Sequence, residues 1–386
     1  MSSTKKIRQQ FQVNFNFDLI FTQRLFDVQN NILVNLLSQN QLEKGKAIIV
    51  IDKGVTESHP KLKTVIKSYF AVHKSSLQIC GDILEISGGE QAKNNENHIK
   101  FLLRNINQFG IDRHSYVIVI GGGAVIDAVG FAASIAHRGV RLIRVPTTVL
   151  SQNDSGVGVK NGINYFGKKN FLGSFAIPYA VINDETFLDT LDDRNWRSGI
   201  SEAIKVALIK DLDFFSWIED HTEALVNRDI ACMTELIYRC AELHMQHTRT
   251  SGDPFEQGSS RPLDFGHWAA HKLEQVSEYK ILHGEAVSAG IALDSTYSFL
   301  NGHLNESEIQ RILDCILNLG FTISYEQMNE QVINGLEEFR EHLGGQLTIM
   351  LLKSIGIGFE VHEMNQELVL KSIDYIRQYS TQKITL

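Results

Sequence analysis

The chain has 386 residues, which is long enough for two domains with large buried cores. Hydrophobic residues make up 43% and charged residues 21%, as in ordinary soluble proteins, and the net charge of −8 comes without a basic stripe, which excludes a typical nucleic-acid partner. The four cysteines show no CxxC spacing and the N-terminus has no signal-peptide run, so we expect reduced thiols, no membrane association and a cytoplasmic location.

Residues 1–190 alternate apolar runs with helical patterns. The predicted strands are KAIIVID (46–52), LQICGDILEI (77–86), YVIVIGGG (116–123) and VRLIRVPTT (140–148). The predicted helices cover 61–73, 95–110 and 124–137. This alternation predicts a doubly wound α/β domain.

Beyond residue 191 long helical patterns dominate and runs of β-branched residues become scarce. Examples are RSGISEAIKVALIKD (197–211), ACMTELIYRCAELHMQH (231–247) and ESEIQRILDCILNLG (306–320). We therefore predict a mostly helical second domain over 191–386. With no Pro/Ser-rich linker between them, the two domains are expected to pack around a shared cleft, a usual place for a ligand.

The first domain has two features that suit a dinucleotide. Gly121, Gly122 and Gly123 lie between a strand and a helix, where glycine lets the backbone approach a pyrophosphate. Asp52 ends an earlier strand, where a carboxylate can bind ribose hydroxyls. The triplet is not a GxGxxG fingerprint, and a tight turn with close helix packing explains it equally well.

Residues 146–173 are predicted to form a polar loop after a strand. Lysines at such a sheet edge suit a phosphate group. The polar side chains in question are Asp154, Lys160, Lys168, Lys169 and Asn170.

The segment RPLDFGHWAAHKLE (261–274) places His267 and His271 on one helix face, and His283 follows. With a carboxylate such as Glu202, two of these histidines would make a three-ligand metal site. Other interpretations stay open at this point. Glu202 and Lys205 also fit a surface ion pair, and Asp264 also fits a helix cap. Spacing alone does not exclude Glu274 or Glu285 as ligands.

Together these stretches resemble the sugar phosphate cyclase superfamily, whose best-known member is 3-dehydroquinate synthase. The resemblance runs from about Asp52 to Gly290. It implies a dinucleotide-binding α/β domain followed by a mostly helical metal-binding domain, a small-molecule sugar phosphate substrate, a homodimer, and NAD with Zn²⁺ or Co²⁺ as cofactors. The implied reaction is a carbon–oxygen lyase reaction: transient oxidation by NAD, phosphate elimination and ring closure.

The resemblance also implies roles for individual residues. The metal ligands are Glu202, His267 and His283, with His271 beside them to position the substrate and move protons. The NAD contacts are Asp52, Glu90, Lys93, Gly122, Gly123, Asp127, Thr147, Thr148, Asp154, Lys169, Thr190 and Leu191. The remaining residues that bind the substrate or its phosphate are Lys160, Asn170, Lys205, Arg261, Asp264 and, across a dimer interface, Arg138.

Several residues depart from the pattern of 3-dehydroquinate synthases. Asp264 stands where those enzymes have asparagine, Trp268 replaces threonine, and Arg261 lies one position too close to His267. The sequence is most similar to a divergent branch labelled EboD-like, and it favours a seven-carbon substrate such as sedoheptulose 7-phosphate. The alternatives are 3-dehydroquinate synthase itself, a metal-dependent polyol or alcohol dehydrogenase, and a non-catalytic homologue.

Overall fold

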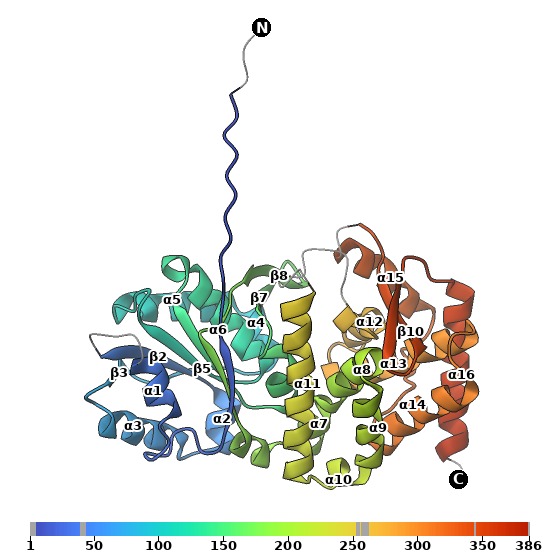
Figure 1. Cartoon of the computed structure of the whole chain (residues 1–386), viewed down its shortest axis with the longest axis horizontal. Helices are drawn as coiled ribbons and strands as arrows, with labels where there is room; N and C mark the ends of the chain where they lie inside the picture. The colour runs from blue at the N-terminus through green and yellow to red at the C-terminus, as the bar shows by residue number, and fades with distance from the viewer. Residues whose placement is uncertain (1–4, 39–43, 252–254, 256–261, 343–344, 385–386) are drawn as a thin grey trace.

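The structure, a computed structural model, describes residues 5–38, 44–251, 255, 262–342 and 345–384. Within these residues, the N-terminal half is built on one seven-stranded sheet in which all pairs are parallel (Figure 1). The strand order is β1-β9-β6-β5-β2-β3, and β4 also pairs with β2. The strands are β1 (Asp18–Thr22), β2 (Gly45–Asp52), β3 (Leu77–Ile79), β4 (Leu84–Ile86), β5 (Tyr116–Gly121), β6 (Arg141–Pro146) and β9 (Ala180–Asp184).

Alternate residues of the central strands enter two separate cores, because successive side chains of a strand point to opposite faces. Ile48 and Val50 of β2 pack with α5 (Glu96–Gln108) and α6 (Gly123–Ile135). Ile49 and its odd-numbered neighbours pack with α1 (Ile32–Ser38) and α3 (Leu62–Val72) on the other face. Helices therefore cover both faces, which confirms the predicted doubly wound fold.

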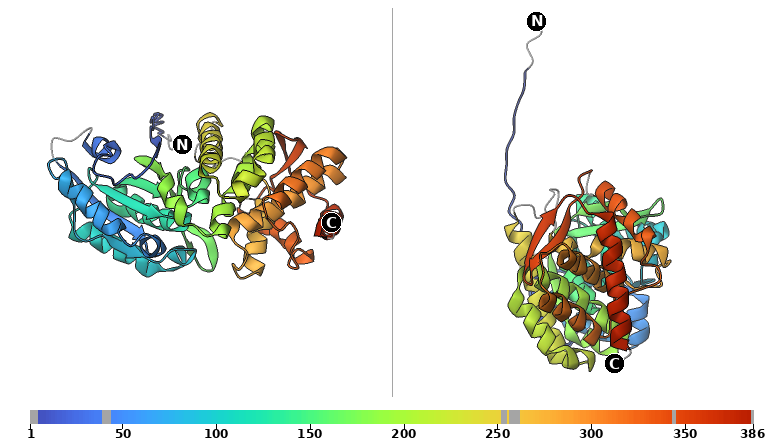
Figure 2. Two further views of the ribbon diagram at one scale, coloured as in Figure 1. Left: turned by 90° about the horizontal axis from the view of Figure 1, so that it is seen from below. Right: turned by 90° about the vertical axis from the view of Figure 1, so that its right-hand side faces the viewer.

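The C-terminal half is mostly helical, as predicted, and lies at the other end of the molecule (Figures 1 and 2). Its centre is α13 (His283–Leu300), which is buried on all sides along most of its length. The other helices are α7 (Asp193–Ser198), α8 (Ile200–Lys210), α9 (Leu212–Asp220), α10 (Thr222–Val226), α11 (Ile230–Thr250), α12 (His267–Val276), α14 (Glu306–Asn318), α15 (Glu330–His342) and α16 (Gln366–Ile384). Among the described residues no helix is long and apolar enough to cross a bilayer.

The structure differs from the sequence prediction at several places. The predicted strand 77–86 is two short strands, β3 and β4, and β9 was not predicted. The predicted polar loop contains a π-helical turn over Ser151–Ser155 and a hairpin, β7 (Lys160–Tyr165) and β8 (Lys168–Phe175). The hairpin turns at Phe166 and Gly167, which both have positive φ as a type I′ turn requires. A second hairpin, β10 (Ile349–Ser354) and β11 (Ile357–Val361), interrupts the helical half. The edge strand β1 was not predicted.

Arg144 holds the start of the β7–β8 hairpin against the sheet. It lies on β6 and is fully buried. Its guanidinium donates to the carbonyl oxygens of Gly156, Gly158 and Lys160 and to Asn161 Oδ1 at 2.8 Å. Burial lowers the pKa of Arg144 to about 10, so the side chain is still charged at neutral pH. The buried Arg144 guanidinium thus holds residues 156–161, which lead into the β7–β8 hairpin, against strand β6.

We expect Arg144→Met to lower the free energy of unfolding by about 3 kcal/mol, because four acceptors, two of them in buried hydrogen bonds, lose a charged donor. Urea denaturation measures this change. Arg113→Met is the matched control, since Arg113 is exposed and donates to one carbonyl, that of His137. The control should stay within about 0.5 kcal/mol of the parent protein. Equal losses in the two variants would contradict the role given to Arg144.

Candidate metal and cofactor site

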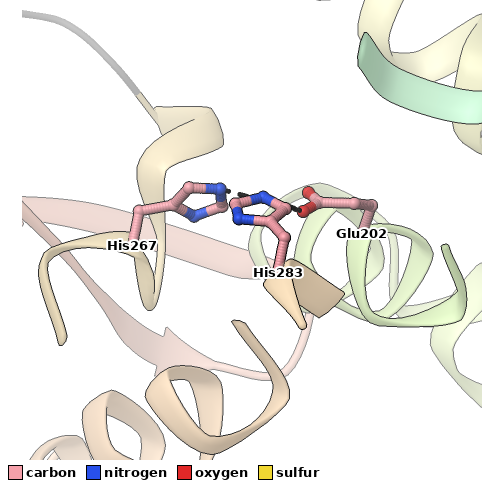
Figure 3. A group of neighbouring side chains, drawn as sticks. All are labelled: Glu202, His267 and His283. Carbon is pink, nitrogen blue, oxygen red and sulfur yellow. Dashed lines mark ion pairs between the residues drawn. The ribbon is translucent and has the colours of Figure 1, made fainter. Parts of the chain in front are cut away.

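Three side chains from three different helices meet between the two halves of the molecule. Glu202 comes from α8, His267 from the start of α12 and His283 from the start of α13 (Figure 3). Glu202 Oε1 lies 3.4 Å from His283 Nε2 and 3.8 Å from His267 Nε2. One ligand atom of each residue lies within 4.8 Å of the others. This is a geometry that one divalent metal ion could bridge.

Both histidines present the same ring nitrogen to Glu202 because the other nitrogen is occupied. His267 Nδ1 donates to the backbone oxygen of Phe265 at 3.1 Å. His283 Nδ1 lies 3.2 Å from Glu274 Oε2, and Glu274 is a buried carboxylate. Each Nδ1 therefore carries a proton and is directed away from Glu202, which leaves each Nε2 facing the carboxylate. Partners of this kind orient histidine ligands in metal sites.

The charges around Glu202 favour a cation. Burial alone would raise the pKa of Glu202, but Lys205 and the two histidines lower it to about 2, so it is ionised. Burial lowers the pKa of His283, but Glu274 and Glu202 outweigh burial and raise it to about 10. Glu202 Oε1 has no hydrogen bond of normal geometry within the described part of the chain. A buried carboxylate oxygen that faces two imidazole nitrogens fits a divalent metal ion, which would replace the proton that His283 Nε2 carries at neutral pH.

A second set of charges lies on the other side of Glu202. Lys205 Nζ is buried, 2.5 Å from Glu202 Oε2 and 3.8 Å from Asp154 Oδ1. Asp154 also accepts a hydrogen bond from His244 Nδ1 at 2.9 Å. Burial lowers the pKa of Lys205, but the two carboxylates outweigh it and raise the pKa above its usual value. A buried ammonium ion therefore lies next to the three candidate ligands, which excludes a solvated surface pair.

The β7–β8 hairpin reaches this site from the sheet side. Lys169 Nζ lies 2.9 Å from Glu274 Oε1, so the carboxylate that orients His283 is also held by the hairpin. The next residue, Asn170, accepts a hydrogen bond from Lys93, which pairs with Asp127 of α6 at 2.8 Å. Strand β8 thus contacts both halves of the molecule, through Lys169 on one side and Asn170 on the other.

Most of the predicted NAD contacts lie along the carboxyl edge of the sheet. Asp52 ends β2, caps α2 (Lys53–Ser58) and accepts from Gly54 N at 2.9 Å. Gly122 caps α6, whose first residue is Gly123. The others follow strands or line the same edge: Thr147 and Thr148 after β6, Glu90 and Lys93 at α4 (Gln91–Asn94), and Thr190 and Leu191 after β9, with Thr190 bonded to His59.

The residues predicted to contact the substrate or its phosphate do not all lie at the candidate metal site. His271 is exposed one turn along α12, its ring centre 5.5 Å from that of His267. Asp264 lies in the turn before α12, and Lys160 starts β7. Arg138 is exposed at the far end of α6 and is not brought into this chain's site. Arg261 lies outside the described residues.

The structure narrows some of the interpretations that the sequence left open. Asp264 does not cap α12, because Gly266 is its N-cap residue. Glu285 binds Arg194 through both oxygens, at 2.8 and 2.7 Å, and so is not a ligand here. Glu274 contacts His283 Nδ1, and with His271 and His283 it forms a second group whose ligand atoms lie within 4.8 Å of one another, so it stays open as a ligand. His244 was missed, since only its spatial contact with Asp154, 90 residues away, marks it.

Comparison with known proteins gives a consistent result. The family models for the 3-dehydroquinate synthase N-terminal and C-terminal domains match residues 83–198 and 199–339. A 3-dehydroquinate synthase from Dictyoglomus thermophilum is 33% identical over 306 residues, 79% of this chain and 85% of that protein.

Solved structures of cyclases are also similar. The 2-epi-5-epi-valiolone synthase ValA from Streptomyces hygroscopicus, with NAD⁺ and Zn²⁺ bound, has a TM-score of 0.86 and 28% identity over 96% of this chain and 99% of its own. A 2-deoxy-scyllo-inosose synthase has a TM-score of 0.76 at 20% identity, over 92% of this chain and 96% of its own, and shows the fold alone.

We expect Glu274→Gln to weaken zinc binding by about 10- to 100-fold, because His283 Nδ1 loses its charged acceptor. Titration against a chelator of known affinity measures the dissociation constant. Glu219→Gln is the control, since it removes the charge of another carboxylate that pairs with Arg311. Similar zinc affinity in the two variants would rule out the orienting role of Glu274.

Proposed function

The chain belongs to the 3-dehydroquinate synthase family, and on that premise we propose that it is a sugar phosphate cyclase with a seven-carbon ketose phosphate, such as sedoheptulose 7-phosphate, as its substrate. The product would be a carbocyclic ketone, formed with loss of phosphate. The observation that carries this proposal is the meeting of Glu202, His267 and His283 beside the buried Lys205. The glycine turn at the nearby sheet edge supports an NAD site.

In this proposal, Zn²⁺ or Co²⁺ is held by Glu202, His267 and His283, and NAD lies along the sheet edge from Asp52 to Gly122. A divalent metal there would supply a Lewis acid that eases deprotonation of a hydroxyl, and NAD would accept and return a hydride. ValA, which is similar over most of its length, binds NAD⁺ and Zn²⁺. The donor set on this chain, one carboxylate and two imidazoles, is suited to such a metal.

The protein side chains would bind the substrate and carry its charges. Lys205 stays protonated at neutral pH because its two carboxylate neighbours raise its pKa. Its positive charge can therefore balance the negative charge of the substrate phosphate, or the charge that develops on a hydroxyl as it loses its proton. Lys160 and Asn170 on the hairpin would bind the phosphate, and losing one such contact should cost about 2–4 kcal/mol in the barrier. The exposed His271 can reach the substrate and exchange a proton with it.

Arg138 supports a homodimer. It is exposed at the end of α6 that lies away from the glycine turn, so in this proposal the substrate phosphate that it binds lies in a neighbouring subunit. An arginine suits that contact because its planar fork binds phosphate oxygens in pairs.

Asp264 supports a substrate without a carboxylate. It lies near Lys205 and His267: its charge adds to the rise in the pKa of Lys205 and opposes the lowering of the pKa of His267 that burial causes. An acidic sugar such as 3-deoxy-arabino-heptulosonate 7-phosphate would bring a second carboxylate toward Asp264, and like charges in a partly buried site repel. A neutral hydroxymethyl end would instead be able to donate a hydrogen bond.

With NAD and zinc, we expect sedoheptulose 7-phosphate to release inorganic phosphate, and 3-deoxy-arabino-heptulosonate 7-phosphate to yield little dehydroquinate. Phosphate assay and mass spectrometry of the cyclic product measure both reactions. Rapid dehydroquinate formation would identify a 3-dehydroquinate synthase instead. Steady NADH formation from simple alcohols without phosphate release would identify a dehydrogenase, and no turnover of any substrate would favour a non-catalytic homologue.

Alanine at His267 or His283 should remove bound zinc and abolish phosphate release, because two ligands no longer hold the ion tightly. Elemental analysis of the purified variants measures the zinc content. His303→Ala is the control, since His303 is an exposed histidine of the same half. Full zinc content in both ligand variants would refute the assignment.

A further inference from the structure

A buried carboxylate outside the candidate ligand set contacts both chain neighbours of His267. Asp294 lies on α13 and is fully buried. Its Oδ2 accepts from the backbone N–H of Gly266 at 2.9 Å, and its Oδ1 accepts from the indole Nε1 of Trp268 at 2.8 Å. One side chain therefore fixes the residues immediately before and after a candidate metal ligand.

The hydrogen bond to Gly266 continues to the His267 ring through a single peptide group. The N–H of Gly266 and the C=O of Phe265 belong to the same planar peptide. Asp294 accepts from the N–H end, and the C=O end accepts from His267 Nδ1 at 3.1 Å. Hydrogen bonds in such a chain polarise one another, so a carboxylate at one end strengthens the bond at the other.

The backbone at this point is packed too closely to shift independently. Gly266 has a φ of 78°, and a Cβ there would lie 2.7 Å from Ile291 N on α13. A Cβ on Gly290 would in turn overlap the carbonyl oxygen of Gly266. Asp294 lies one helical turn beyond Gly290, on the same face of α13. The position of His267 is thus set by this contact between α12 and α13.

Burying the carboxyl group of Asp294 costs free energy, because the group loses its contact with water. Burial raises its pKa to about 7, although both hydrogen bonds lower it. No lysine or arginine pairs with it in the part of the chain that the structure describes. A buried carboxyl group needs its hydrogen bonds to offset the loss of water, so Trp268 and Gly266 are the groups that keep it in place.

We propose that Asp294 and Trp268 are positioning residues for His267, with Asp294 acting through the Phe265–Gly266 peptide as the outer carboxylate of that ligand. The arrangement parallels Glu274, which contacts His283 directly. Trp268 is the indole donor that this arrangement uses. The inference rests on the proposed metal site.

The test compares two tryptophan variants loaded with Co²⁺. Trp268→Phe removes the indole donor to Asp294, and Trp196→Phe removes a buried indole donor to the Leu225 carbonyl, away from the ligands. We expect the Co²⁺ dissociation constant of Trp268→Phe to exceed that of Trp196→Phe about 10-fold. Its visible Co²⁺ absorption bands should shift, whereas those of Trp196→Phe should match the parent protein.

Asp294→Asn, alone and combined with Trp268→Phe, provides an independent measurement. Because both residues act on one peptide, the double variant should bind Co²⁺ about as weakly as the weaker single variant. If the losses of Co²⁺ affinity in the two single variants multiply in the double variant, Asp294 and Trp268 do not act through the same peptide.

If Asp294→Asn does not fold, the comparison of the two tryptophan variants tests the inference by itself. Equal constants and unshifted bands in those two would overturn the inference while leaving the metal site intact. A parent protein that binds no Co²⁺ would overturn the proposed function together with the inference.

Discussion

The arrangement around Glu202 depends on one constraint: a fully buried carboxylate needs cations on both of its oxygens. Lys205 provides one on the side of Asp154, and Nε2 of His267 and His283 face the other oxygen, where the proton of His283 or a bound metal ion supplies the second. Ionised carboxylates are almost never fully buried without such partners. The junction between the two halves is organised around supplying positive charge to this group.

The outer residues of the site follow from the same constraint. An imidazole offers its lone pair to a cation only if its other nitrogen carries the proton, and that proton needs an acceptor. Glu274 accepts it for His283, and the Phe265 carbonyl accepts it for His267. Each acceptor is held in turn, by Lys169 or by the peptide that Asp294 binds. Behind the candidate ligands therefore stand the acceptors of their Nδ1 protons, and behind these stand the groups that hold the acceptors in place. These outer groups come from segments far apart in the chain.

Sequence patterns were sufficient for the layered fold, but spacing left the metal ligands open, and only the family resemblance singled out Glu202, His267 and His283, which the structure brings within 4.8 Å. Their role as ligands stays a prediction. The β7–β8 hairpin was missed because its turn, Phe166–Gly167, lacks the Asn-Gly or Asp-Gly pair that marks such turns. The contacts of Asp294 and His244 were missed because they join residues 26 to 90 positions apart, which no local periodicity records.

The hairpin has a mechanical consequence. Lys169 and Asn170 are consecutive residues, yet one pairs with Glu274 on α12 and the other with Lys93 beside α6. Any hinge motion that widens the junction must break one of these contacts or carry the strand along with one half. Widening of the junction and loosening of the His283 ring are therefore linked, because the carboxylate that Lys169 holds is the one that contacts His283 Nδ1.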